Sequence, residues 1–281
     1  MNLGYDRPLY LLPFDHRHSY VTGMFHFTPP LTTDQIEAVA GSKQVIYDGF
    51  RQALREVPVA AAGILVDEEF GAGILRDAVR NTYVTALSTE KSGSDEFRFE
   101  YGAEFVKHIQ TFAPTFAKAL VRYNPEGDAA LNRRQTIRLQ QLSDYCRAVD
   151  QLFMFELLIP ATEAQKDRFR ADETRYDLEM RPQLMLQAIR ALQDAGVEPD
   201  VWKIEGIDRR EDCERVVETA RRGGRSEVGC IVLGRNAGEK KVVEWLETAA
   251  SVPGFIGFAV GRTTYWDAVA DYVARKATRQ E

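Results

Sequence analysis

Two lysines lie inside segments that are otherwise apolar, where an ammonium group is costly. Lys118 occurs in FAKALVRY and Lys203 in VWKIEG. A buried ammonium must be paired or neutral, and burial beside a second ammonium lowers the pKa of a lysine. A neutral amine can attack a carbonyl carbon and form a Schiff base. The two lysines therefore fit a nucleophile and its positive neighbour; the alternatives are an outward-reaching side chain or a structural ion pair.

Acidic residues accompany these lysines in the same kind of context. Glu156 lies in the apolar run FMFELLIP and requires a cation partner, which a lysine on a neighbouring strand would supply. Such a pair can also move protons during Schiff-base chemistry. Asp15 opens the polar stretch DHRHS after the run LYLLPF, where a solvated loop is the alternative. The histidines of this stretch, His16 and His18, also leave open a metal-dependent site, although the other two histidines lie in unrelated contexts.

Two glycine–arginine segments follow the last two apolar runs and are candidates for binding an anion. They read GRNAG over residues 234–238 and GRTT over residues 261–264. Glycine lets backbone N–H groups approach an anion, and arginine adds a bidentate fork. We expect a substrate phosphate to be bound by Gly234, Arg235, Asn236, Gly261 and Arg262, with Arg17 and Lys91 as further cations.

Two other polar segments have more than one interpretation. Asp67-Glu68-Glu69 fits either a rim of carboxylates or the N-terminus of a helix, where acidic side chains are favoured. Glu90 and Lys91 alternate sides if their strand continues, so at most one of them faces the interior. A surface loop is the alternative for this second pair.

The elements that must position these residues are short apolar runs that alternate with amphipathic stretches. The runs cover residues 9–14, 60–66, 83–87, 116–123, 152–159, 201–204, 228–233 and 255–260. Helical patterns cover residues 33–57, 130–149, 181–195, 208–222, 239–250 and 264–277, and residues 161–182 fit a loop with the start of a helix. Near-continuous apolar strands indicate a covered parallel sheet.

Eight such units in 281 residues predict the α/β class and a single (β/α)8 TIM barrel that spans residues 1–281 as one domain. The main rival is a doubly wound open sheet. That fold normally has a glycine-rich turn after its first strand, where this chain reads DHRHS. In a barrel the C-terminal strand ends carry the chemistry, and this would bring the polar residues above to one rim.

Composition narrows the class of protein. A net charge of −6 argues against binding to nucleic acid or an anionic membrane. The three cysteines, Cys146, Cys213 and Cys230, form no CxxC motif, so neither a disulfide framework nor a zinc site is expected. The chain contains neither a signal-peptide pattern at its start nor an apolar run long enough to span a bilayer. We therefore expect a soluble, cytoplasmic protein.

Three segments resemble a known family. PLYLLPFDHRHS, DVWKIEG and GFAVGRTTYWDAV are similar to the aldolase-like barrel that forms the C-terminal half of fused inositol-catabolism kinases, regarded as a 2-deoxy-5-keto-gluconate 6-phosphate aldolase. More distantly, the chain resembles the tagatose-bisphosphate and sulfofructose-phosphate class I aldolases. The resemblance runs from about Pro8 to Asp267. The chain departs from the family at the loop after the seventh strand. This loop is often Ser/Gly-rich in the relatives but reads GRNAG here, with the additional Arg235, so the identity of the bound anion stays open.

The resemblance implies roles for individual residues. Lys203-Ile204-Glu205 matches the context of the Schiff-base lysine, and the relatives' strand-four lysine, strand-one aspartate and strand-five glutamate fall on Lys118, Asp15 and Glu156. The phosphate or sulfonate site of the relatives falls on Gly234 and Arg262.

The activity that this resemblance implies is that of a class I aldolase, a carbon–carbon lyase without metal or cofactor. It would cleave a phosphorylated keto sugar or keto acid, such as 2-deoxy-5-keto-gluconate 6-phosphate, to dihydroxyacetone phosphate and an aldehyde. The alternatives are a metal-dependent lyase or isomerase that uses His16 and His18, and a non-catalytic sugar-phosphate-binding barrel. The expected partner is a phosphorylated small molecule; the exact substrate and self-association into a homo-oligomer stay open.

Overall fold

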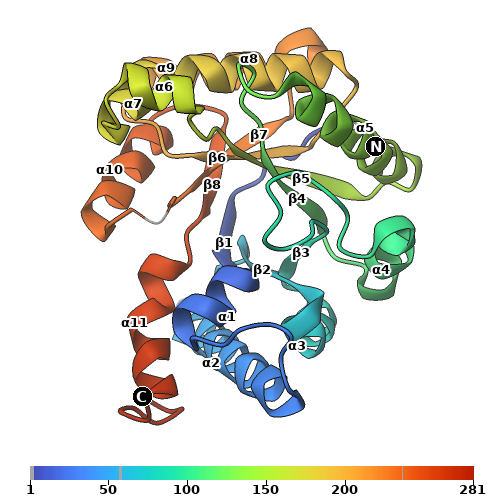
Figure 1. Ribbon diagram of the computed structural model, residues 1–281. Coiled ribbons are helices and arrows are strands. Elements are labelled where there is room, and N and C mark those ends of the chain that lie inside the picture. Colours follow the sequence, from blue (N-terminus) through green and yellow to red (C-terminus); the bar gives the residue numbers. More distant parts are fainter. Residues whose placement is uncertain (1–2, 57–58, 236) are drawn as a thin grey trace.

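A computed structural model describes residues 3–56, 59–235 and 237–281 (Figure 1). Eight parallel strands form a closed barrel in which each strand pairs with the next and the last pairs with the first. The single (β/α)8 TIM barrel predicted from the sequence is confirmed. The strands are β1 (Leu9–Pro13), β2 (Ala62–Val66), β3 (Val84–Ser88), β4 (Phe116–Arg122), β5 (Leu152–Leu158), β6 (Val201–Glu205), β7 (Gly229–Leu233) and β8 (Phe255–Ala259).

Helices surround the barrel (Figure 1). They are α1 (His18–Met24), α2 (Thr33–Glu56), α3 (Glu68–Arg80), α4 (Phe105–Phe112), α5 (Ala129–Ala148), α6 (Glu163–Arg168), α7 (Glu173–Glu179), α8 (Arg181–Asp194), α9 (Arg210–Ala220), α10 (Glu239–Ala250) and α11 (Arg262–Val273). All six predicted helical stretches contain a helix, although residue 57 lies outside the described residues. The segment 161–182, expected to be a loop with the start of a helix, contains the short helices α6 and α7 before α8 begins at Arg181.

The helical interpretation of the segment at Asp67 is correct. Asp67 is the N-cap of α3, and its side chain accepts a hydrogen bond from the backbone N–H of Phe70 at 2.9 Å. The same buried carboxylate forms an ion pair with Lys43 of α2. Asp67 therefore anchors two helices and does not belong to a rim of free carboxylates.

The interior of the barrel has an apolar layer with a polar layer above it. The apolar layer contains one buried side chain or more from every strand: Leu9, Leu11, Leu65, Ala86, Phe116, Met154, Val201, Ile231 and Ala259. Because side chains of a strand alternate between faces, the residue two positions later points to the same interior. Those positions are Ser88, Lys118, Glu156 and Lys203 on β3 to β6, where Glu156 and Lys203 are register partners.

The closure between β8 and β1 depends on close backbone approach. Gly257 of β8 has φ of 158°, and a Cβ atom added there would lie 1.8 Å from the carbonyl oxygen of Leu9. At the end of the same strand, a Cβ on Gly261 would lie 2.0 Å from the carbonyl oxygen of Pro13. Both positions therefore require glycine, and Gly261 brings the start of α11 against the end of β1.

None of the described helices is both long enough and apolar enough to cross a membrane.

Candidate active site

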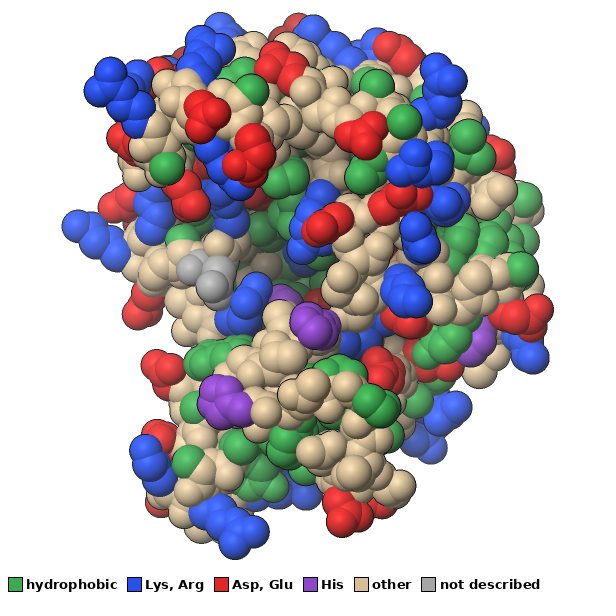
Figure 2. All heavy atoms as spheres, in the orientation of Figure 1, with side chains coloured by type: hydrophobic (Ala, Val, Ile, Leu, Met, Phe, Trp, Pro, Cys, Tyr) green, Lys and Arg blue, Asp and Glu red, His purple; other side chains and the backbone are tan. Residues whose placement is uncertain are grey.

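A cavity of about 500 Å³ opens at the C-terminal ends of the strands. Lysine, arginine and histidine side chains gather around the hollow in Figure 2. Of the residues expected to form the site, the cavity is lined by Asp15, Arg17, Lys91, Glu156, Lys203, Gly234, Arg235, Gly261 and Arg262. Lys118 is fully buried next to Asp15 and Glu156. Asn236, the remaining expected residue, lies outside the described residues.

Lys118 is held by three carboxylates. Its Nζ lies 2.8 Å from an oxygen of each of Asp15, Glu90 and Glu156, and its side chain is 0% exposed. Burial alone would lower the pKa of this lysine, as the sequence suggested. The carboxylates of Asp15, Glu156 and Glu90 outweigh burial, however, and raise the pKa of Lys118 above its ordinary value. Lys118 is therefore a permanent cation at neutral pH.

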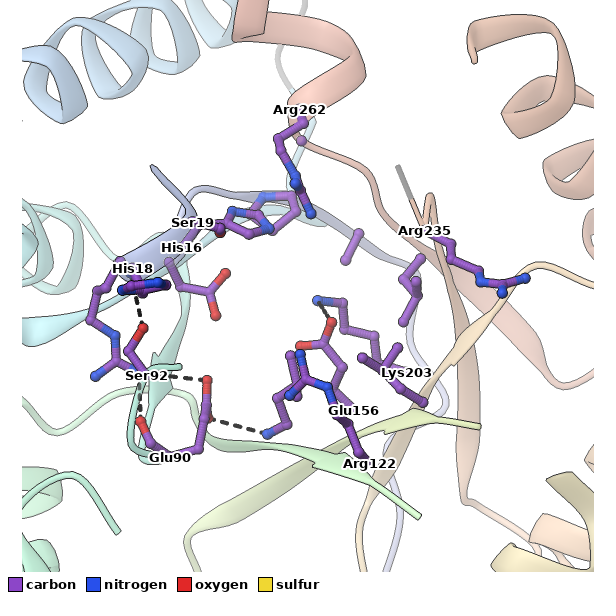
Figure 3. Close-up of a pocket in the computed structure, with 18 of the residues that line it drawn as sticks. His16, His18, Ser19, Glu90, Ser92, Arg122, Glu156, Lys203, Arg235 and Arg262 are labelled. Carbon is purple, nitrogen blue, oxygen red and sulfur yellow. Dashed lines mark hydrogen bonds and ion pairs between the residues drawn. The ribbon is translucent and has the colours of Figure 1, made fainter. Parts of the chain in front are cut away.

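Glu156 joins the two lysines. One of its carboxylate oxygens lies 2.8 Å from Lys118 Nζ, and the other lies 2.7 Å from Lys203 Nζ (Figure 3). Burial would raise the pKa of Glu156, but Lys118 and Lys203 lower it below its ordinary value. Asp15 behaves in the same way: burial opposes ionisation, yet Lys118 and other neighbouring cations hold its pKa well below 3.8. Both side chains are thus carboxylates at neutral pH.

Glu90 is a site residue that the sequence analysis did not include among the expected catalytic or binding residues. Its carboxylate binds Lys118 and also accepts a hydrogen bond from the backbone N–H of Leu120 at 3.2 Å. Its neighbour Lys91 is exposed at the cavity rim, so only Glu90 of this pair turns inward. Two signals were available: the alternation of the pair, and the need of a buried lysine for counter-ions.

Arg17 supports Glu90. Its buried guanidinium donates to the backbone carbonyl of Glu90 and to the carboxylate of Glu100, the latter at 2.6 Å. These contacts hold Arg17 at the edge of the cavity as a support for the loop after β3. A phosphate at Arg17 would have to compete with both partners.

The two arginines of the glycine–arginine segments differ in their contacts. Arg235 lines the cavity, but its guanidinium pairs with Glu205 at 2.9 Å and with Asp177 of α7, and it extends away from the cavity centre in Figure 3. Arg262 begins α11 and points into the cavity. Within the described parts of the chain, no carboxylate forms an ion pair with Arg262. Of these two arginines, Arg262 is therefore the one whose guanidinium is not paired with a carboxylate of the described residues.

Arg122, at the end of β4, is a further cavity cation that the sequence did not single out. It is 40% exposed, and its nearest carboxylate, on Asp95, is 3.9 Å away. For a metal, the described residues contain no group of three or more His, Cys, Asp or Glu side chains arranged to hold an ion. His16 and His18 both line the cavity, and His18 is exposed at the start of α1.

Comparisons with known proteins agree with this architecture. One family model, described as "Uncharacterized protein conserved in bacteria (DUF2090)", matches residues 5–281. A search of curated proteins finds no match.

Among solved structures, a Schiff-base-forming fructose-1,6-bisphosphate aldolase is 13% identical, with a TM-score of 0.60 over 96% of this chain and 94% of its own. An archaeal fructose 1,6-bisphosphate aldolase is 11% identical, with a TM-score of 0.61 over the same shares of 96% and 94%. The fructose-bisphosphate aldolase of Slackia heliotrinireducens is 12% identical, with a TM-score of 0.58 over 97% of this chain and 83% of its own. At these identities the likeness concerns the fold.

Proposed function

The chain belongs to the DUF2090 family, and we propose that it is a class I aldolase in which Lys203 forms a Schiff base with the substrate. The observation that carries this proposal is the asymmetry of the two buried lysines. Lys118 is bound by three carboxylates, whereas Lys203 contacts one, that of Glu156. Lys203 also lines the cavity, so its amine can meet a substrate.

The chemistry follows from these contacts. Glu156 takes a proton from Lys203, and the neutral amine attacks the ketone carbon. The resulting carbinolamine loses water and leaves an iminium on Lys203. The bond between the α and β carbons of the substrate then breaks. Its electron pair forms the double bond of an enamine as the C=N π electrons move onto nitrogen, while the β hydroxyl loses its proton and becomes the carbonyl of the released aldehyde. Protonation of the enamine carbon and hydrolysis return Lys203 and release the ketone product.

Lys118 supplies a fixed positive charge next to this reaction. Its ammonium keeps Asp15 and Glu156 ionised, as their lowered pKa values indicate. Both carboxylates are then able to accept protons and to orient substrate hydroxyls.

The substrate that we propose is a phosphorylated keto sugar or keto acid, such as 2-deoxy-5-keto-gluconate 6-phosphate, with dihydroxyacetone phosphate as the ketone product. Arg262, the N-terminus of α11 and the glycines Gly234 and Gly261 support a phosphate site between β7 and β8, a common place for one in this fold. The Schiff-base-forming aldolase among the structural neighbours acts on a sugar bisphosphate, fructose 1,6-bisphosphate, and this agrees with the proposed class of substrate.

Borohydride trapping tests the proposal. The protein is incubated with dihydroxyacetone phosphate or with 2-deoxy-5-keto-gluconate 6-phosphate, reduced, and mapped by peptide mass spectrometry. We expect a covalent adduct on Lys203 and none in Lys203→Arg, while Lys91→Arg, a matched change at the cavity rim, still traps. Absence of any adduct in the unaltered protein, or an adduct that persists in Lys203→Arg, would overturn the proposal. Trapping without turnover of the keto acid phosphate would retain the Schiff base and reject that substrate.

A further inference from the structure

His16 lies in the proposed active site without a role in the steps above. It follows β1 and lines the cavity. Figure 3 places His16 and Arg262 on the same side of the cavity, across from Lys203 and Glu156. A substrate with its phosphate at Arg262 and its ketone at Lys203 therefore passes in front of this imidazole.

The ring has one buried edge. Nδ1 of His16 is buried and has no hydrogen-bond partner among the described residues. Buried polar atoms are normally satisfied, and an orphaned N–H group is rarer than an orphaned acceptor. The favoured tautomer therefore places the lone pair on buried Nδ1 and the proton on Nε2. Because the residue is only half-buried and lines the cavity, the Nε2 edge is the one left for a ligand.

The backbone of His16 is held in place by a buried lysine of α2. Lys43 Nζ donates a hydrogen bond to the carbonyl oxygen of His16 at 3.0 Å, and Lys43 is itself fully buried and ion-paired with Asp67. Asp67 is the N-cap of α3. The buried Lys43–Asp67 ion pair thus fixes the backbone carbonyl of His16. The imidazole ring of His16 is therefore held at a defined place on the cavity wall.

The charge state of the ring agrees with a donor role. Burial lowers the pKa of His16 to about 4; Arg262 and Lys203 lower it too, while Asp15 and Glu156 oppose the shift. His16 is therefore neutral at neutral pH and has one N–H donor and one acceptor nitrogen. A neutral imidazole that donates a hydrogen bond can polarise a carbonyl.

We propose that Nε2–H of His16 donates a hydrogen bond to the ketone oxygen of the substrate while Lys203 attacks the ketone carbon. The proposal rests on the proposed Schiff-base function. As the C–N bond forms, the carbonyl π bond breaks and its electron pair moves onto the oxygen that His16 binds. That oxygen gains the proton that Glu156 took from the Lys203 ammonium, and a second proton from the same nitrogen, relayed through Glu156, allows it to depart as water. His16 keeps its own proton throughout, so it acts as an electrophilic hydrogen-bond donor.

The test compares single-turnover trapping rates with dihydroxyacetone phosphate in the unaltered protein, His16→Leu and His16→Gln. Loss of one preorganised donor to a developing oxyanion costs roughly 100–1,000-fold in rate, and we expect such a loss in His16→Leu. His16→Gln, whose amide N–H can still donate, should recover to within about tenfold of the unaltered rate. His26→Asn, a change at an exposed histidine outside the cavity whose positive φ asparagine tolerates, should trap at the unaltered rate.

Two further readouts separate this proposal from others. Inorganic phosphate binding and thermal unfolding of His16→Leu should match the unaltered protein, which excludes loss of the anion site or of the fold. The pH profile of trapping between pH 6 and 9 should keep its shape in His16→Gln, since a neutral imidazole contributes no titration there.

An unaltered trapping rate in His16→Leu overturns the proposal. So does a trapping rate that changes with pH between pH 6 and 8 in the unaltered protein but not in the His16 variants, because His16 would then titrate in that range. If the unaltered protein traps nothing, the failure belongs to the Schiff-base function instead.

Discussion

Lys203 Nζ lies 2.7 Å from Oε1 of Glu156, and the two residues are register partners on adjacent strands. The second oxygen of the same carboxylate binds Lys118 at 2.8 Å. One carboxylate thus lies between Lys118, which two other carboxylates also contact, and Lys203, which lines the cavity. Protons released by the amine have an acceptor within hydrogen-bond distance.

This relationship predicts the effect of Glu156→Gln. The amide preserves the size of the side chain but cannot take up a proton, so we expect the turnover number to fall by about 10²–10⁴. The Schiff base should still form on long incubation with dihydroxyacetone phosphate, because the amine of Lys203 is intact. Steady-state assays and timed borohydride trapping measure the two effects. Glu163→Gln, an exposed change on α6, is the control, and equal turnover of both variants would contradict the role of Glu156.

The contacts of the two arginines predict different consequences of their removal. Arg262→Gln removes a charged donor that points into the cavity, so inorganic phosphate should bind about 10–100-fold more weakly. Arg235→Gln should change phosphate binding by less than about threefold, since its guanidinium is engaged with Glu205 and Asp177. It should instead lower the free energy of unfolding by about 1–3 kcal/mol, because Glu205 is buried and loses a partner.

Calorimetric phosphate titration and urea unfolding of both variants provide the measurements. A stronger loss of phosphate binding in Arg235→Gln than in Arg262→Gln would reverse the assignment of the anion site.

The fold and the polar layer of the barrel were predictable because both depend on local pattern. Apolar runs of strand length place the strands, and alternation then puts Lys118, Glu156 and Lys203 on the interior face. The charge of Glu156 inside an apolar run was itself a sign of a nearby cation, and both lysines supply it.

What the sequence did not predict depends on pairing across the fold. Glu90 lies in a loop, and only the closed barrel brings it to Lys118, so the third carboxylate around Lys118 was not foreseen. Similarly, Arg235 meets Asp177 because the segment before α8 forms the helix α7, which the charged sequence there did not indicate. Loop conformation and counter-ion geometry are set by tertiary contacts and have no short-range signature.

The glycine at the closure of the barrel predicts a large effect on stability. In Gly257→Ala, the methyl group would overlap the Leu9 carbonyl, and φ of 158° is unfavourable for alanine. We expect a loss of about 2–3 kcal/mol in the free energy of unfolding. Gly73→Ala is the matched control: this exposed position in α3 has open space around it, and the change should stabilise by about 0.5–1 kcal/mol. Urea unfolding measures both, and equal stability of the two variants would contradict the close approach of β8 to β1.

Lys118→Met predicts a change in how stability depends on pH. In the unaltered protein the pKa values of Asp15 and Glu156 are lowered. The two carboxylates therefore stabilise the fold at pH values above their ordinary pKa values, and this stabilisation is lost as the pH falls through their lowered pKa values. Without the ammonium, burial would instead raise the pKa values of the carboxylates around it. The variant should be less stable by about 3–5 kcal/mol at pH 7, because buried charges lose their partner.

Protonation of those carboxylates removes the unpaired buried charges of the variant. The difference in free energy of unfolding between the unaltered protein and Lys118→Met should therefore shrink from pH 7 to pH 5. Denaturant unfolding at both pH values measures the trend, with the exposed Lys166→Met on α6 as a control that should show no such pH dependence. A difference that stays constant or grows as the pH falls would mean that Lys118 does not compensate the carboxylates of Asp15, Glu90 and Glu156. The charge balance that the proposed Schiff-base reaction at Lys203 requires would then have to come from other groups.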